Sequence, residues 1–112
     1  MLSDKAKELI ASQRRIYVAS MPEKKKVIEQ CMQQVKAAVR TGDLKLCDTL
    51  FQQVHRLAGS AGIFGFDSLG RAALNVDRYL IAHSLEVGDM DELAALLQIL
   101  LNEIDNVAGE HL

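Results

Sequence analysis

The sequence lacks tryptophan altogether and holds one proline and two cysteines among its 112 residues. Two cysteines are too few for a disulfide framework, and Cys31 and Cys47 both fall at apolar positions of expected helices. We therefore expect reduced thiols in the core of a cytoplasmic protein. No apolar run approaches the length of a membrane span, and the N-terminus lacks the charged-then-apolar order of a secretory signal.

Clustered metal ligands and a surplus of basic residues are missing as well. No Cys-x-x-Cys pair or His/Cys cluster has the spacing of a metal site, and the formal net charge is −2. Nucleic-acid-binding domains usually carry a basic face. We therefore expect no bound metal or other cofactor, no nucleic-acid or membrane partner, and a monomer.

The composition that remains is that of an ordinary folded domain. Hydrophobic residues make up 49% of the sequence and charged residues 25%. A chain of this length fits one domain, so we expect a single domain over residues 1–112. With aromatic residues at only 4%, the core must consist of Leu, Ile, Val, Ala and Met, as helical bundles usually do.

Apolar residues recur at helical spacing along the whole chain, and no stretch alternates apolar and polar as a half-buried strand would. Ser20, with Pro22 and Glu23 after it, predicts a capped helix start, and turns around Gly42 and Gly88 separate later helices. The expected helices cover Asp4–Ala19, the segment from this capped start to about Arg40, Asp43–Gly62, Asp67–Ser84 and Met90–Ala108.

The last four expected helices have similar lengths and short connections, which favour antiparallel neighbours. The expected fold class is therefore all-α, an antiparallel up-down four-helix bundle with an extra N-terminal helix. We expect that extra helix, Asp4–Ala19, to pack across one end of the bundle as a lid.

The third expected helix places a histidine beside a strip that has no side chains. At about 100° per residue, His55 lies about 120° from the centre of the apolar seam, at the boundary with solvent. Gln52, Gly59 and Gly62 fall on the same side. A glycine inside a helix costs about 1 kcal/mol relative to alanine, so the pair indicates that something large approaches His55 closely. Close helix packing is the alternative use of such glycines, and Gly62 also fits a helix C-cap.

An exposed histidine in this setting suits the transfer of a phosphoryl group. The ordinary pKa of histidine, near 6.5, leaves a neutral nucleophilic nitrogen at cell pH. A phosphoryl group on that nitrogen stays reactive enough to be passed on. For His55 taken alone, a solvated surface residue without a role is the alternative. We expect Gln52 to hydrogen-bond the ring or the phosphate, with an idle surface glutamine as the alternative.

The stretch His-Arg-Leu-Ala-Gly-Ser-Ala from His55 to Ala61 resembles a family signature. The histidine-phosphotransfer (HPt) family carries His-x-Leu-Lys-Gly-Ser-Ala, followed by a glycine that opens the next helix, where this chain has Gly65. The family pattern then continues over the next helix, and Asp77 stands where members often have Glu or Gln. The joint spacing of His55, Gly59, Ser60 and Gly65 makes the resemblance specific.

This resemblance, to stand-alone bacterial members, implies a phosphorelay carrier without kinase activity. His55 would accept a phosphoryl group from the aspartate of a receiver domain or hybrid sensor kinase and pass it to a response regulator. The receiver domain would supply the Mg²⁺. We expect the supporting and docking residues to be Gln52, Arg56, Ala58, Gly59, Gly62 and Asp77.

The chain departs from the family pattern at Ala58, where most members have a lysine that meets the phosphoryl oxygens. Arg56 and Arg78 are the candidate replacements. The departure supports an alternative function, an HPt-like module that docks and sequesters receiver domains without relaying phosphate. The presence of His55 and Gly59 together argues against it. A kinase is not expected, because no strand precedes a phosphate-cradling glycine-rich loop.

Overall fold

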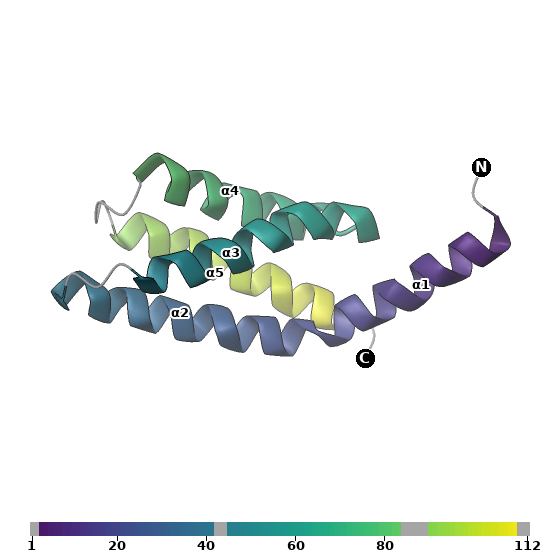
Figure 1. Ribbon diagram of the computed structural model, residues 1–112, viewed down its shortest axis with the longest axis horizontal. Coiled ribbons are helices and arrows are strands. Elements are labelled where there is room, and N and C mark those ends of the chain that lie inside the picture. The colour runs from purple at the N-terminus through teal and green to yellow at the C-terminus, as the bar shows by residue number, and fades with distance from the viewer. Residues whose placement is uncertain (1–2, 42–44, 84–89, 110–112) are drawn as a thin grey trace.

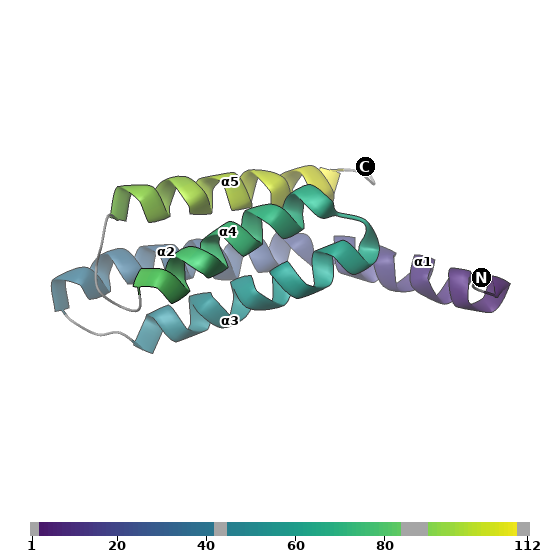
Figure 2. The same cartoon turned by 90° about the horizontal axis from the view of Figure 1, so that it is seen from above.

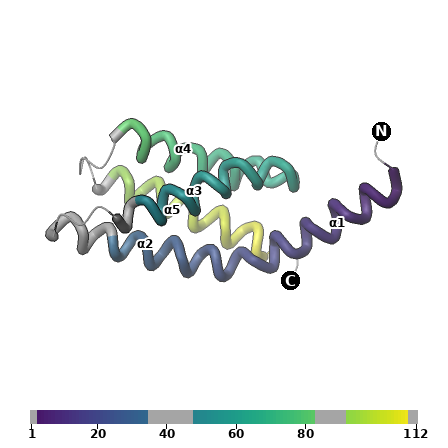
Figure 3. Tube along the Cα trace, in the orientation of Figure 1, coloured from purple at the N-terminus to yellow at the C-terminus, as the bar shows by residue number. Residues whose placement is uncertain are grey.

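The computed structural model describes residues 3–41, 45–83 and 90–109, and this part of the chain is wholly helical. Figures 1 and 2 show helices lying alongside one another along the long axis, and Figure 3 traces the same path. The prediction of an all-helical bundle is confirmed. The elements are α1 (Asp4–Ala19), α2 (Met21–Thr41), α3 (Lys45–Ser60), the 3₁₀ helix η1 (Ala61–Phe64), α4 (Asp67–His83) and α5 (Met90–Gly109).

The predicted helix ends agree with the observed ones to within two residues wherever both are described. The third helix ends at Ser60 rather than Gly62, because the chain tightens there into η1. The predicted start at Asp43 and the predicted end at Ser84 lie outside the described residues. Gly65 terminates η1 with a left-handed φ of 82°, so the helix C-cap considered for Gly62 belongs to Gly65.

Ser20 joins α1 to α2 without a break in helical conformation. Its φ and ψ are −81° and −11°, and its Oγ donates a 2.6 Å hydrogen bond to the Tyr17 carbonyl. An N-cap needs an extended backbone and a side-chain oxygen that accepts from the following amides. The prediction that Ser20 caps the second helix is therefore wrong. The prediction that Pro22 lies in the first turn of α2 is confirmed.

Because the junction stays helical, most of α1 projects beyond the bundle, roughly continuing the direction of α2 (Figures 1 and 3). The side chains of Leu9 and Ile16 are 61% and 62% exposed. The radius of gyration is 15.4 Å, whereas a compact domain of this length has about 13 Å. Only the last turn of α1, at Tyr17 and Val18, is buried. The lid prediction is wrong for the rest of the helix.

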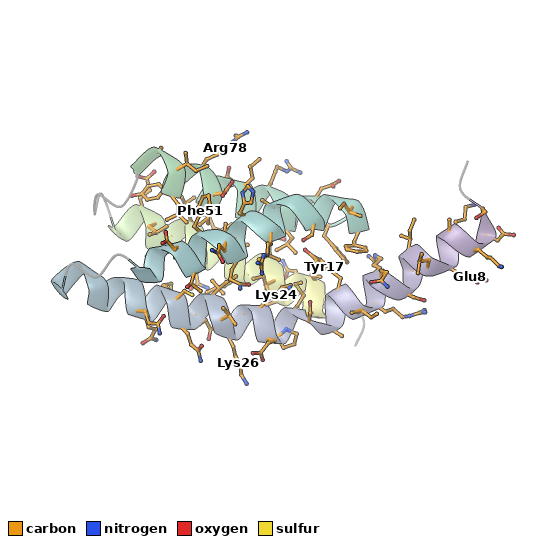
Figure 4. All side chains as sticks on the ribbon, viewed as in Figure 1. Glu8, Tyr17, Lys24, Lys26, Phe51 and Arg78 are labelled. Carbon is orange, nitrogen blue, oxygen red and sulfur yellow. The ribbon has the colours of Figure 1, made fainter. Side chains whose placement is uncertain are left out.

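That last turn of α1 packs on the segment that follows α3 (Figure 4). The Tyr17 hydroxyl lies 2.8 Å from Ser60 Oγ, and the Tyr17 ring centroid lies 4.8 Å from that of Phe64. The Arg14 guanidinium lies 4.4 Å from the Phe66 ring centroid and donates to the Phe64 carbonyl. Burial raises the pKa of the Tyr17 hydroxyl, although the hydrogen bond with Ser60 acts in the opposite direction. The contacts tie α1 to η1.

The core of the bundle consists mainly of aliphatic side chains, as the composition predicts. Cys31 is buried at 3% exposure, and burial raises the pKa of its thiol. The side chain of Cys47 lies outside the described part. The largest fully buried side chains are Met21, Ile28, Leu50, Leu57, Leu69, Leu97, Leu100, Ile104, Val54 and Val76.

The bundle closes by packing α2 against both α3 and α5. Lys25 on α2 forms an ion pair with Asp105 on α5, with 2.9 Å between Nζ and Oδ1. The Asp105 carboxylate raises the pKa of Lys25. The pair is exposed to solvent, so it marks the contact between α2 and α5 more than it stabilises it. Within the described ranges, no helix combines the length and the apolar character that crossing a membrane requires.

Candidate functional site

His55 lies on the solvent side of α3, next to the apolar stripe that this helix buries. Its neighbour Val54 is fully buried, as is Leu50 one turn earlier. The His55 side chain is 66% exposed, so a large partner can reach the ring directly. The periodicity of α3 therefore produces the accessible histidine that the sequence predicts.

A buried carboxylate from the next helix meets the inner nitrogen of this ring. Asp77 on α4 is 6% exposed and is the one buried charged residue in the described part of the chain. Both of its oxygens lie 3.3 Å from His55 Nδ1. A carboxylate accepts hydrogen bonds, so Nδ1–H is the donor in this contact. Burying a carboxylate without a hydrogen-bond partner destabilises a fold. The contact with His55 therefore stabilises the buried position of Asp77.

The ring of Phe51 stacks on the ring of His55. The two centroids are 5.6 Å apart and the planes meet at 17°, within the range of favourable offset stacking. Phe51 is half-buried, one helical turn before His55 on the side of α3 nearer to α4 (Figure 4). Sequence reasoning missed this residue. The i, i+4 spacing of an aromatic residue and a histidine on one helix was the available signal.

Beyond His55, the surface of α3 and η1 carries two exposed glycines. Gly59 is the next-to-last residue of α3, and Gly62 lies in η1. A Cβ built on either would meet no other atom within 4 Å. Close packing therefore does not require glycine at these positions. The space beside both residues is open.

The other predicted site residues lie on the same two helices as His55 and Asp77. Gln52 and Arg56 are exposed on α3, and the hydrogen bonds of the His55 ring go to Asp77. Ala58 is half-buried and packs against the core. Arg78 follows Asp77 on α4, and Figure 4 shows its side chain extending away from the bundle into solvent. Their functional roles stay predictions.

Among residues 3–41, 45–83 and 90–109, no group of three or more His, Cys, Asp or Glu side chains comes together as a metal site would require. The chemistry that the described side chains offer is that of an exposed imidazole with one nitrogen hydrogen-bonded to a buried carboxylate.

Comparison with known proteins identifies the family to which the chain belongs. No curated protein and no solved structure matched the chain significantly. The family model of the Hpt domain matches residues 14–110, which include all of the site and leave out most of α1. The chain therefore belongs to the Hpt domain family.

Proposed function

We propose that this protein is a phosphorelay carrier without kinase activity of its own. His55 accepts a phosphoryl group from the aspartate of a receiver domain or hybrid sensor kinase and passes it to a response regulator. The observation that carries the proposal is an exposed imidazole whose Nδ1 meets a buried carboxylate. Family membership supports the role of phosphotransfer in two-component signalling.

In the proposed reaction, Nε2 of His55 attacks the phosphorus atom of the partner's aspartyl phosphate. The N–P bond forms while the bond from phosphorus to the aspartate oxygen breaks, and the electron pair leaves with the partner's carboxylate. The ring gains positive charge, which the carboxylate of Asp77 offsets while Nδ1–H remains bonded to it. The reverse sequence delivers the group to the next receiver. The Mg²⁺ belongs to the receiver domain.

The bundle serves this reaction as a rigid support. In the proposal, the up-down antiparallel arrangement of α2 to α5 presents α3 and α4 side by side, so that one supplies the nucleophile and the other its carboxylate partner. Gly59 and Gly62 keep the approach open for a receiver. In the proposal the carrier is a monomer, since His55 and Asp77 come from one chain.

A receiver-docking module without relay is the alternative, and Ala58 is the observation that favours it. A lysine at this position would supply a cation for the phosphoryl oxygens, and Ala58 instead packs half-buried against the core. The nucleophile and its carboxylate partner are nevertheless both in place, which favours the carrier. A docking module would bind receivers and take up no label.

The direct test is labelling by a phosphorylated receiver. The His55→Gln protein should keep its helical circular-dichroism spectrum and take up no phosphoryl label, while a matched His83→Gln variant on α4 should label normally. The bond in the labelled protein should be labile in acid and stable in alkali, as a phosphoramidate is. Label that persists in the His55→Gln protein would refute the proposal.

A further inference from the structure

The hydrogen bond from His55 to Asp77 is long and is shared between the two carboxylate oxygens. Both Nδ1–O distances are 3.3 Å, beyond the usual 2.7–3.2 Å for N–H···O bonds. The single Nδ1–H donor is shared between the two Asp77 oxygens, and the His55 side chain is two-thirds exposed. A second contact is therefore needed if the ring is to present one nitrogen steadily.

The stack with Phe51 supplies a constraint of a different kind. The last side-chain torsion of histidine is broad and roughly two-fold, so the ring turns easily and two opposite orientations share one plane. A ring stacked at 17° to Phe51 is restricted to that plane, but both opposite orientations fit the stack equally. Asp77 distinguishes them, because only one orientation turns Nδ1 toward the carboxylate.

We propose that Phe51 is a positioning residue for His55, holding the plane of the imidazole so that Asp77 can select the orientation with Nε2 toward the incoming phosphoryl group. The inference rests on the proposed function of His55. Phe51 itself touches neither the partner's phosphate nor Asp77 in this role. Its half-buried position on α3 keeps the phenyl ring beside the histidine between transfer events.

Replacing Phe51 by leucine removes the aromatic ring and keeps an apolar side chain. In the Phe51→Leu protein, the single-turnover transfer rate at saturating receiver should fall about 2- to 12-fold, which is the loss expected for one aromatic stack. The receiver concentration that gives half-maximal rate should stay unchanged, because an apolar surface remains. Phe51→Tyr keeps the stack and should restore the rate. A half-maximal concentration that rises at an unchanged maximal rate would make Phe51 a docking residue instead.

A spectroscopic measurement on the unphosphorylated protein tests the same inference without any receiver. Nitrogen-15 shifts of the neutral His55 ring should report one dominant tautomer, protonated at Nδ1, in the unmodified and Phe51→Tyr proteins. Phe51→Leu and Phe51→Met should show a mixture of tautomers. The matched control is Phe64→Leu, because the Phe64 ring contacts Tyr17 in a tilted arrangement, and it should leave the His55 signals unchanged.

The outcomes separate this inference from the proposed function. If His55→Gln still takes up label, the proposed function fails, yet the tautomer measurement still reports whether Phe51 holds the ring. If Phe51→Leu and Phe51→Met keep a single tautomer while their helical spectra remain intact, Phe51 does not position the ring. If Phe51→Tyr behaves like Phe51→Leu, stacking is not the cause and the inference is overturned.

Discussion

Replacing Gly59 by glutamine should separate the folding of the protein from its docking to a receiver. Because a Cβ at this position meets no other atom within 4 Å, the new side chain causes no clash. The loss of a glycine from a helix should stabilise the protein by about 0.5–1 kcal/mol. With about 2.1 cal/mol/K of unfolding entropy per residue over 112 residues, the melting temperature should rise by about 2–4 °C. Because Gly59 lies in the last turn of α3, we expect the rise in melting temperature to fall at the lower end of this range.

Phosphotransfer should respond in the opposite direction. The glutamine would stand one turn beyond His55 on the side that a receiver approaches, and a small misplacement of reacting groups costs on the order of 100-fold in rate. The measurements are a thermal melt followed by circular dichroism and a time course of label transfer from a phosphorylated receiver. Ala95→Gln, at an exposed position of α5, controls for added bulk elsewhere.

Two results would refute this reasoning. Normal transfer by the Gly59→Gln protein would mean that the open surface beside Gly59 has no part in docking. A lower melting temperature would mean that the glycine serves packing after all. Gly70→Gln offers the contrast, because a Cβ at Gly70 would lie in van der Waals contact, 3.5 Å from the Ala61 Cβ, so this variant should gain less stability than Gly59→Gln.

Three further predictions concern the neighbourhood of the site and α1. Ala58→Lys should shift the transfer equilibrium toward phosphorylated His55 by about 1.4- to 5-fold, as an exposed charge pair allows. The measurement is the ratio of phosphoprotein to phosphoreceiver at fixed Mg²⁺. No change would mean that another cation already meets the phosphoryl oxygens. Tyr17→Phe should cost about 0.5–1.5 kcal/mol through the lost hydrogen bond with Ser60. Burial raises the pKa of Tyr17 in the folded protein above 10.0. The contribution of Tyr17 to the free energy of unfolding is therefore complete below pH 10 and declines as the pH rises through the folded pKa. Denaturant melts of the Tyr17→Phe protein should lack this decline. Deleting residues 1–12 should reduce helical content yet change the free energy of unfolding by no more than about 0.5 kcal/mol, since Leu9 and its neighbours are exposed.

Periodicity and helix breakers predict most of the helical framework. The first helix begins at Asp4 and ends at Ala19 as expected, because Ser3 caps it and its polar and apolar residues follow helical spacing. The start of α5 at Met90 is likewise predictable from the sequence. These features depend on neighbouring residues alone, which is why sequence patterns contain them.

The junction at Ser20 could not be predicted from neighbouring residues in the sequence. A serine with a proline two residues later is a signal for a helix start, yet here the Ser20 hydroxyl donates a hydrogen bond to the Tyr17 carbonyl and the helix continues. The outcome depends on how Tyr17 packs against Ser60 and Phe64, residues more than forty positions away. No pattern within one helix reports such a contact, so the direction of α1 could not be predicted.

Some features of the site could be predicted from the sequence, and others depend on how the helices pack. The exposure of His55 follows from its place on the helical wheel, and the resemblance to the HPt signature draws attention to Asp77. The distance between their side chains depends on how α3 and α4 pack, which only the fold supplies. Phe51 was overlooked because an aromatic residue next to an apolar seam is usually part of the core, and its stack with the histidine is a matter of geometry.

The packing of α2 against α5 has a consequence for how the chain folds during synthesis. Lys25 and Asp105 are 80 positions apart, so the earliest of the bundled helices is completed by the one made last. Until α5 emerges, Leu97, Leu100 and Ile104 are absent from the core that they share with α2. Nascent chains that stop before α5 expose apolar surface and are prone to aggregate. The bundle should therefore fold in a single cooperative step once its last helix is free of the ribosome.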